Sequence, residues 1–315
     1  MTRRLFLPIV ALALAVLACN VPAEAPTLPT NTLPPGAATA TFTLPATDTV
    51  APGPSDTPAT PAPPGSGGLT LDLLRSGTYR APYFDRTVTL VNGSYSDGAG
   101  YSVRMLEVHA FGDLTGDDRD DAAVILAEND GGSGTFESVL AVELRSGAAH
   151  QISEQGLGDR VQIGSADISS GVIHLNMTVH GPADPLCCPS LPQRQNFWLI
   201  GNSLWLMRVT STIGGVERAI NITSPGNWVS VTNPFSVNGS VSVAPFENTL
   251  AYKVYLIDGT VVNESSLIVN SSGMFSKAFD FSAAGITDFI IVQLADHSAA
   301  DGSIQALGSV ILDLH

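Results

Sequence analysis

Two neighbouring stretches, FSVNGSVSV (residues 235–243) and LAYKVYLID (residues 250–258), decide the fold of the C-terminal part of the chain. Apolar and polar residues alternate in both, which is the period of a β-strand with one face in a core and the other in solvent. Similar short runs, separated by Gly, Asn, Asp and Ser, continue across residues 220–315. About seven such strands in a segment of this length predict a β-sandwich of two packed sheets.

Turn residues and one aromatic refine this prediction. Pro225 and Pro234 cannot donate to a strand ladder, so each is expected at a strand end. Gly239 and Gly259 suit turns that need a positive φ, the latter in an Asp-Gly pair typical of tight hairpins. Phe246 is expected to anchor the core.

Six short motifs follow one another through the same segment. They are ITSP (222–225), NPFSVNG (233–239), PFENTL (245–250), LIDG (256–259), SGMF (272–275) and DGS (301–303). Their order and spacing resemble the immunoglobulin-like domain of bacterial spore-germination-associated proteins, a module of many exported bacterial proteins. The resemblance implies an adhesive or spacer module at the cell surface, and no catalytic residue comes with it.

The preceding segment, residues 68–210, is also predicted to be β-rich. Runs such as DDAAVILAE (120–128) and FWLIGNSLWLM (197–207) combine β-branched, aromatic and aliphatic residues between turn signals. Only TLDLLRSG (70–77) suggests a helical turn or two. We therefore expect an all-β protein, with an acidic β-rich domain over 68–210, a boundary near residues 208–219 and the sandwich over 220–315.

The first residues, MTRRLFLPIVALALAVLACN (1–20), have the organisation of a secretory signal. Two arginines precede an apolar run, and VLAC (16–19) resembles the lipobox of bacterial lipoproteins, which implies cleavage after residue 18 and a diacylglycerol on the sulfur of Cys19. The alternative is an ordinary signal peptide with an incidental cysteine. Residues 19–67 are rich in Pro and Thr without an apolar period, so we expect a disordered linker there. The predicted location is the extracytoplasmic face of the cell membrane, with the lipid as membrane anchor.

The net charge of the chain limits the classes of molecule that it is expected to bind. There are 29 acidic against 14 basic side chains, a formal net charge of −15. Such a surface repels phosphate backbones, so nucleic acid is not an expected partner.

One acidic stretch, FGDLTGDDRDDAAVIL (111–126), has the oxygen spacing of a short calcium-binding turn. Asp113, Thr115, Asp117 and Asp121 fall at positions 1, 3, 5 and 9 of that spacing. It resembles the calcium loop of the FG-GAP type of β-propeller repeat, although Asp118 stands where the turn wants glycine. Calcium is the one cofactor that the sequence suggests, and a solvated acidic turn is the alternative.

Two adjacent cysteines, Cys187 and Cys188, lie in DPLCCPS (184–190). Because an exported protein meets an oxidising environment, we expect a vicinal disulfide that acts as a rigid turn. Two reduced thiols, pairing between chains, and a metal held with His174 or His180 are the alternatives.

The sequence contains no nucleophile elbow, HExxH motif or Cys/His dyad, so the protein is not predicted to be an enzyme. The expected function is a non-catalytic binding or scaffold module for an envelope polysaccharide or protein. A redox-responsive protein, a calcium-dependent protein and a glycan hydrolase remain as alternatives, with Glu107, Glu128 and Glu143 expected on strands or loop rims. Among the tryptophans, Trp198 and Trp205 are expected in a core, while Trp228 is a candidate for sugar stacking or core packing.

Overall fold

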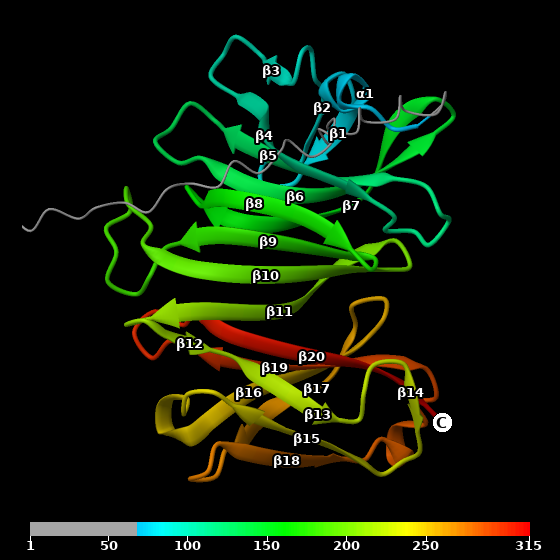
Figure 1. Cartoon of the computed structure of the whole chain (residues 1–315), viewed down its shortest axis with the longest axis vertical. Coiled ribbons are helices and arrows are strands. Elements are labelled where there is room, and N and C mark those ends of the chain that lie inside the picture. Colours follow the sequence, from blue (N-terminus) through cyan, green and yellow to red (C-terminus); the bar gives the residue numbers. More distant parts are fainter. Residues whose placement is uncertain (1–67) are drawn as a thin grey trace, which may run out of the picture. The chain divides into compact units, whose positions relative to one another are not determined.

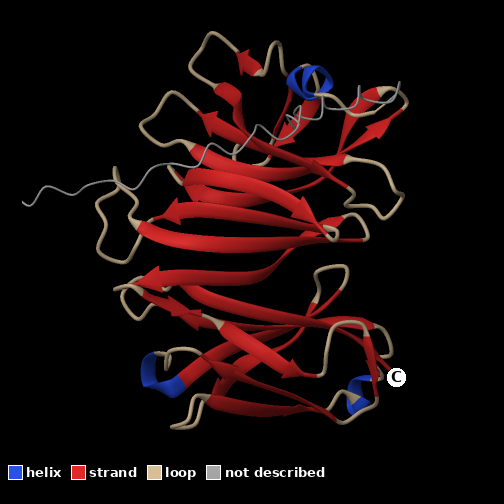
Figure 2. Cartoon of the chain, in the orientation of Figure 1, coloured by secondary structure: helices blue, strands red, loops and turns tan. Residues whose placement is uncertain are grey.

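Antiparallel strands make up nearly all the regular structure of residues 68–315, the part of the chain that the computed structural model describes (Figures 1 and 2). The helical pieces are α1 (Leu71–Arg75) and two 3-10 turns, η1 (Phe246–Asn248) and η2 (Ser282–Ala284). The all-β prediction is therefore confirmed. The predicted signal peptide (1–18), Cys19 and the linker to residue 67 lie outside the described residues. No helix within 68–315 is long and apolar enough to cross a membrane.

A five-stranded antiparallel sheet, in the order β3-β4-β5-β6-β7, lies near the start of the described chain. Its strands are β3 (Ser94–Ser96), β4 (Ser102–Gly112), β5 (Asp121–Asn129), β6 (Phe136–Arg145) and β7 (Ala148–Asp159). Every residue of β5 except Asn129 is buried, because both faces of this sheet are covered. Coverage of both faces explains why the sequence of β5 is a continuous apolar run rather than an alternation.

One face of the five-stranded sheet is covered by α1 and by the hairpin of β1 (Thr78–Ala81) and β2 (Arg86–Thr89). Leu74 and Tyr79 are fully buried in this layer, and the hydroxyl of Tyr79 donates to the carbonyl of Leu74 at 2.7 Å. The opposite face packs on β8–β11 through Ile125, Val139, Ile173, Leu175, Phe197 and other apolar side chains.

A ten-stranded sheet runs through the rest of the protein in the order β17-β16-β19-β20-β11-β10-β9-β8, with β12 paired to β11 and β14 paired to β20 (Figure 1). Its strands are β8 (Gln162–Ser169), β9 (Val172–Val179), β10 (Leu191–Ile200), β11 (Ser203–Ile213), β12 (Val216–Arg218), β14 (Val229–Val231), β16 (Thr249–Leu256), β17 (Val261–Ile268), β19 (Phe289–His297) and β20 (Ile304–Leu314). A single sheet thus crosses from the middle segment into the C-terminal segment.

A three-stranded sheet completes the C-terminal sandwich. It contains β13 (Ile220–Ser224), β15 (Phe235–Val241) and β18 (Met274–Phe279), and it packs on β16, β19 and β20. The core between the two sheets includes the stacked rings of Phe235, Phe279 and Phe281. This is the two-sheet sandwich predicted from the alternating stretches.

The chain segment near the expected boundary lies within the long sheet. Only Arg208 and Val209 of β11 pair directly with β20, opposite Gly308 and Leu307. We call this contact between the middle and the C-terminal segment the joint. Three side chains extend it by donating hydrogen bonds to backbone carbonyls on its other side: Gln293 to Leu206 at 2.8 Å, Ser211 to Gln305 at 2.6 Å, and Gln193 to Ile304 at 2.9 Å. Residues 68–315 all belong to one compact unit.

The predictions for two glycines and one phenylalanine of the C-terminal segment differ in outcome. Gly259 has a φ of 91°, as its turn position predicted. The turn prediction for Gly239 is wrong, because this residue lies inside β15, where a Cβ would come within 2.3 Å of the Asn221 carbonyl. Phe246 is not a core anchor, since 61% of it is exposed.

Candidate functional site

The acidic loop before β5 binds its own backbone. The carboxylate of Asp113 accepts hydrogen bonds from the amides of Gly116, Asp117 and Asp118 at 2.6, 3.3 and 3.0 Å. Desolvation would raise the pKa of Asp113, but these amide donors outweigh it and hold the pKa below its usual value. Asp118 has a φ of 62°, so aspartate adopts the left-handed conformation where the calcium turn would have glycine.

Asp121, the last predicted ligand, points away from solvent. Only 3% of it is exposed, and its Oδ2 accepts from the amides of Leu114 and Thr115, both at 2.9 Å. Burial raises the pKa of this carboxyl against the effect of the two amides. Asp117 caps the amide of Arg119 at 3.0 Å. Within residues 68–315, no three His, Cys, Asp or Glu side chains converge as a metal would require, and calcium at Asp113, Thr115, Asp117 and Asp121 stays a prediction.

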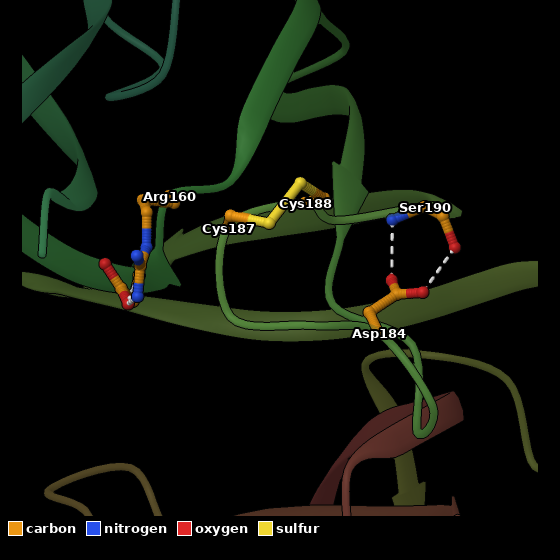
Figure 3. Close-up of a disulfide and its surroundings, with 6 residues drawn as sticks. Arg160, Asp184, Cys187, Cys188 and Ser190 are labelled. Atoms are coloured by element: carbon orange, nitrogen blue, oxygen red, sulfur yellow. Dashed lines mark hydrogen bonds and ion pairs between the residues drawn. A yellow bond between two sulfur atoms is a disulfide. The ribbon is translucent and has the colours of Figure 1, made fainter. Parts of the chain in front are cut away.

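The adjacent cysteines lie in the exposed loop between β9 and β10, where a disulfide joins Cys187 and Cys188 (Figure 3). Asp184 closes the same loop independently. It accepts from the amide and the hydroxyl of Ser190, each at 2.7 Å (Figure 3). It also accepts from the amide of Gly181 at 2.7 Å. Backbone hydrogen bonding from Gly181 and the Ser190 hydroxyl lower the pKa of Asp184. Two features therefore support the shape of the loop: the covalent disulfide and the hydrogen bonds that Asp184 accepts.

Two carboxyls are buried in the five-stranded sheet. Glu128, expected on a strand or a loop rim, lies on strand β5, where it is fully buried and accepts from the amides of Tyr83 and Phe84 and from the Tyr101 hydroxyl. Glu137 on β6 accepts from the amide of Val161 at 3.0 Å, and burial raises its pKa to about 7. In the register of β5 and β6, Glu137 lies opposite Ala127, one residue from Glu128. Neighbouring positions on a strand point to opposite faces, so these two carboxyls do not form an acid pair.

The other carboxyls considered for catalysis are engaged in surface contacts. Glu107 forms a salt bridge with Arg75 at 2.8 Å, and its side chain is 86% exposed. Glu143 contacts Arg145 and His150 on the hairpin that joins β6 and β7. Neither residue faces a second carboxyl across a cleft of the described chain.

The strongest candidate site is the outer face of the long sheet. We define the outer face by residues of β9–β11 that point away from the five-stranded sheet. They are Asn176, Arg194, Asn196, Trp198, Arg208 and Thr210. In the register, Asn176, Arg194 and Thr210 form one cross-strand row, and Asn196 and Arg208 form the next. The alternate residues Leu175 and Phe197 are buried in the core behind the sheet.

Two hollows lie along this face. A hollow of about 480 Å³ includes Asn176, Arg194 and Thr210, with Glu217 of β12 also in its lining. A second hollow of about 200 Å³ includes Asn196, Trp198 and Arg208, and its wall is formed by Ile220 and Ile222 of β13. The floor therefore comes from the middle segment and part of the wall from the C-terminal sandwich.

Aromatic rings border the smaller hollow. Trp198 stacks on Trp228 with ring centroids 6.4 Å apart, and Trp228 meets the edge of Phe289 at 5.9 Å. Trp198 and Trp205 are half-buried against a small apolar cluster at the joint, whereas 53% of Trp228 is exposed. Of the three tryptophans, Trp228 is thus the one that reaches solvent most.

Sequence reasoning missed Arg194, Asn196 and Arg208. A usable signal was present, because Arg194, Asn196 and Trp198 occupy alternate positions of one strand whose other face carries Phe197. What could not be read from the sequence is that Arg208 on the next strand lies opposite Asn196.

The chain was compared with protein families, curated proteins and solved structures. No family model matches the chain, and no curated protein or solved structure matches it.

Proposed function

We propose that the protein is a lipoprotein, held on the extracytoplasmic face of the cell membrane by a lipid on Cys19. Residues 68–315 act there as a non-catalytic module that binds or scaffolds an envelope polymer or protein. The VLAC motif before Cys19 supports the anchor. The observation that carries the binding role is the outer face of β9–β11, where polar side chains and Trp198 line two hollows and the exposed Trp228 stacks on Trp198.

The engagement of the buried acids supports a non-catalytic role. Glu128 and Glu137 hold loop amides on opposite sides of the five-stranded sheet, so their carboxyls have structural partners. Retaining and inverting glycosidases instead place two carboxyls across one scissile bond. A hydrolase would need another acid pair.

A second candidate function is a redox-responsive envelope protein. The exposed position of the Cys187–Cys188 disulfide favours it, because a reductant can reach both sulfurs. The Asp184 contacts argue for a small response, since they hold the loop without the disulfide.

Labelling with radioactive palmitate tests the proposed anchor. The full-length chain is expressed in a bacterial host, together with Cys19→Ala and, as a matched control, Cys187→Ser. We expect the wild type and Cys187→Ser to incorporate the label and to be recovered in the membrane fraction. Cys19→Ala should show neither. Unlabelled protein in the cytosol with residues 1–18 still attached contradicts the proposal.

A further inference from the structure

Two arginines on the outer face have no acidic partner. Of the ten arginines within residues 68–315, six form salt bridges with carboxylates: Arg75, Arg80, Arg86, Arg145, Arg160 and Arg218. Arg104 and Arg119, which lie outside the outer face, form none in this part of the chain. Arg194 and Arg208 instead donate to neutral amides, to Asn176 Oδ1 and Asn221 Oδ1, each at 3.0 Å. In a chain with a net charge of −15, the face thus carries two arginines that form no salt bridge within the described residues.

The two arginines are close along the face, although their guanidinium groups bind different neighbours, Asn176 of β9 and Asn221 of β13, and line different hollows. Arg194 lies opposite Thr210, and Arg208 is two residues from Thr210 on the same strand. Such diagonal neighbours are about 7–8 Å apart at their Cα atoms, within reach of long side chains. Each guanidinium retains N–H groups beyond its one amide contact, and a guanidinium binds a carboxylate with paired hydrogen bonds.

The aromatic end of the face is held rigidly. The φ of Trp228 is 64°, in the left-handed region that a bulky side chain seldom adopts. Two hydrogen bonds with Ile311 fix this backbone: the Trp228 amide donates to the Ile311 carbonyl at 2.7 Å, and Asn227 Oδ1 accepts from the Ile311 amide at 3.0 Å. The ring is thereby kept half in solvent beside Trp198 instead of turning into the core.

Between the arginines and the rings lie neutral hydrogen-bonding groups. Asn196, Asn227 and Ser309 line the smaller hollow, and Ser309 Oγ is buried there without a hydrogen-bond partner in residues 68–315. Glu217, in the lining of the larger hollow, is the one acidic residue among the side chains that line these two hollows.

These features together suit one class of ligand. An aromatic face takes the C–H face of a pyranose ring, amide and hydroxyl groups bond to sugar hydroxyls, and each guanidinium group can bind a carboxylate of a successive sugar. We propose that the outer face, together with the adjoining Trp228, binds an acidic polysaccharide whose sugars carry carboxylates. This rests on the proposed binding function and names its ligand class.

Titration calorimetry of the full-length chain in detergent tests the site. The probes are polygalacturonate, its fully methyl-esterified form, which keeps the sugars and loses the charge, and poly-L-glutamate, which keeps the charge and lacks the sugars. We expect binding of polygalacturonate that weakens as salt is raised, and at least about ten-fold weaker binding of either other polymer.

Variants locate the binding. Arg194→Gln, Arg208→Gln and Trp228→Ala should each weaken polygalacturonate binding about ten-fold or more. Two controls should leave it unchanged: Arg119→Gln removes an exposed charge from the acidic loop, and Phe246→Ala removes an exposed ring. Near-ultraviolet circular dichroism verifies that each variant is folded, and Trp228→Phe replaces Trp228→Ala if the latter is not.

Three outcomes overturn the inference: no binding of polygalacturonate, equal binding of the ester or of polyglutamate, or equal effects of Arg208→Gln and Arg119→Gln. Membrane anchoring by palmitate labelling is measured separately. A lipidated protein that ignores polygalacturonate refutes the ligand class alone, and an unlabelled cytosolic protein refutes the proposed function.

Discussion

The two sandwiches of this protein share one sheet but have different cores. The first, between the five-stranded sheet and β8–β11, buries Asp121 and Glu137, and each carboxyl accepts from the amides of a neighbouring loop. The second, between the three-stranded sheet and β16, β19 and β20, is filled mainly by aliphatic and aromatic side chains, including three stacked phenylalanines, and its one buried carboxyl, Asp296, is paired with Arg218. Burial raises the pKa of both carboxyls in the first core. We therefore expect the stability of the first sandwich to vary with pH through these carboxyls, and that of the second to depend mainly on packing.

The largest expected effect is in the second core. Replacing Phe279, which is 3% exposed and stacks on Phe235 and Phe281, leaves a cavity. Phe279→Ala should lower the free energy of unfolding by about 3–5 kcal/mol at every pH between about 4 and 8. This range spans the window from 4.5 to about 7 over which the carboxyl of Glu137 differs in protonation between the unfolded and the folded chain. Urea unfolding at several pH values measures this. If the destabilisation by Phe279→Ala varies strongly with pH, the second core does not depend mainly on packing.

The second prediction concerns Glu137. In the unfolded chain its carboxyl titrates near 4.5, and in the folded protein near 7, so the folded state binds more protons between these values. The free energy of unfolding should therefore fall as pH rises through this window. Glu137→Gln keeps an acceptor for the Val161 amide and removes the charge, so it should stabilise the protein by about 2–3 kcal/mol at pH 8 and by little at pH 4.

Unfolding at both pH values checks this prediction, with Glu107→Gln as the matched control on the surface. An equal effect of Glu137→Gln at the two pH values would show that its carboxyl is not desolvated.

The third prediction separates the buried acid of the acidic loop from its exposed neighbour. Asp121→Ala leaves the amides of Leu114 and Thr115 without their acceptor and should cost about 1–3 kcal/mol. Asp117→Ala loses one exposed contact and should cost less than about 1 kcal/mol. Thermal melts with calcium and with chelator also test the predicted metal site, because a bound ion would raise the Tm of the wild type and not that of Asp121→Ala.

The smallest effect is expected at the vicinal disulfide. Reduction should change the Tm little, because Asp184 still holds Gly181 and Ser190. Reduction of Asp184→Ala should loosen the loop, seen as faster amide exchange over residues 181–190. Equal exchange in the reduced wild type and the reduced variant would mean that Asp184 does not support the loop.

The sequence predicts the strands of both sandwiches better than their connection. Alternation in 235–243 and the apolar run of β5 follow directly from which faces are buried. The pairing of Arg208 with Gly308 joins residues a hundred positions apart, and no local pattern encodes it. The same limit applies to the site: Arg194, Asn196 and Trp198 share a strand, but Arg208, Asn227 and Trp228 reach them only through strand pairing and the stacked rings.

Calorimetric melting of the full-length protein, with and without polygalacturonate, tests the central claim most directly, because the two sandwiches together build the site. The floor of the outer face belongs to the first, and Ile220, Asn227 and Trp228 belong to the second. The account predicts one unfolding transition for residues 68–315, moved to higher temperature by the polymer. Two separate transitions, or a single one that the polymer leaves in place, would contradict it.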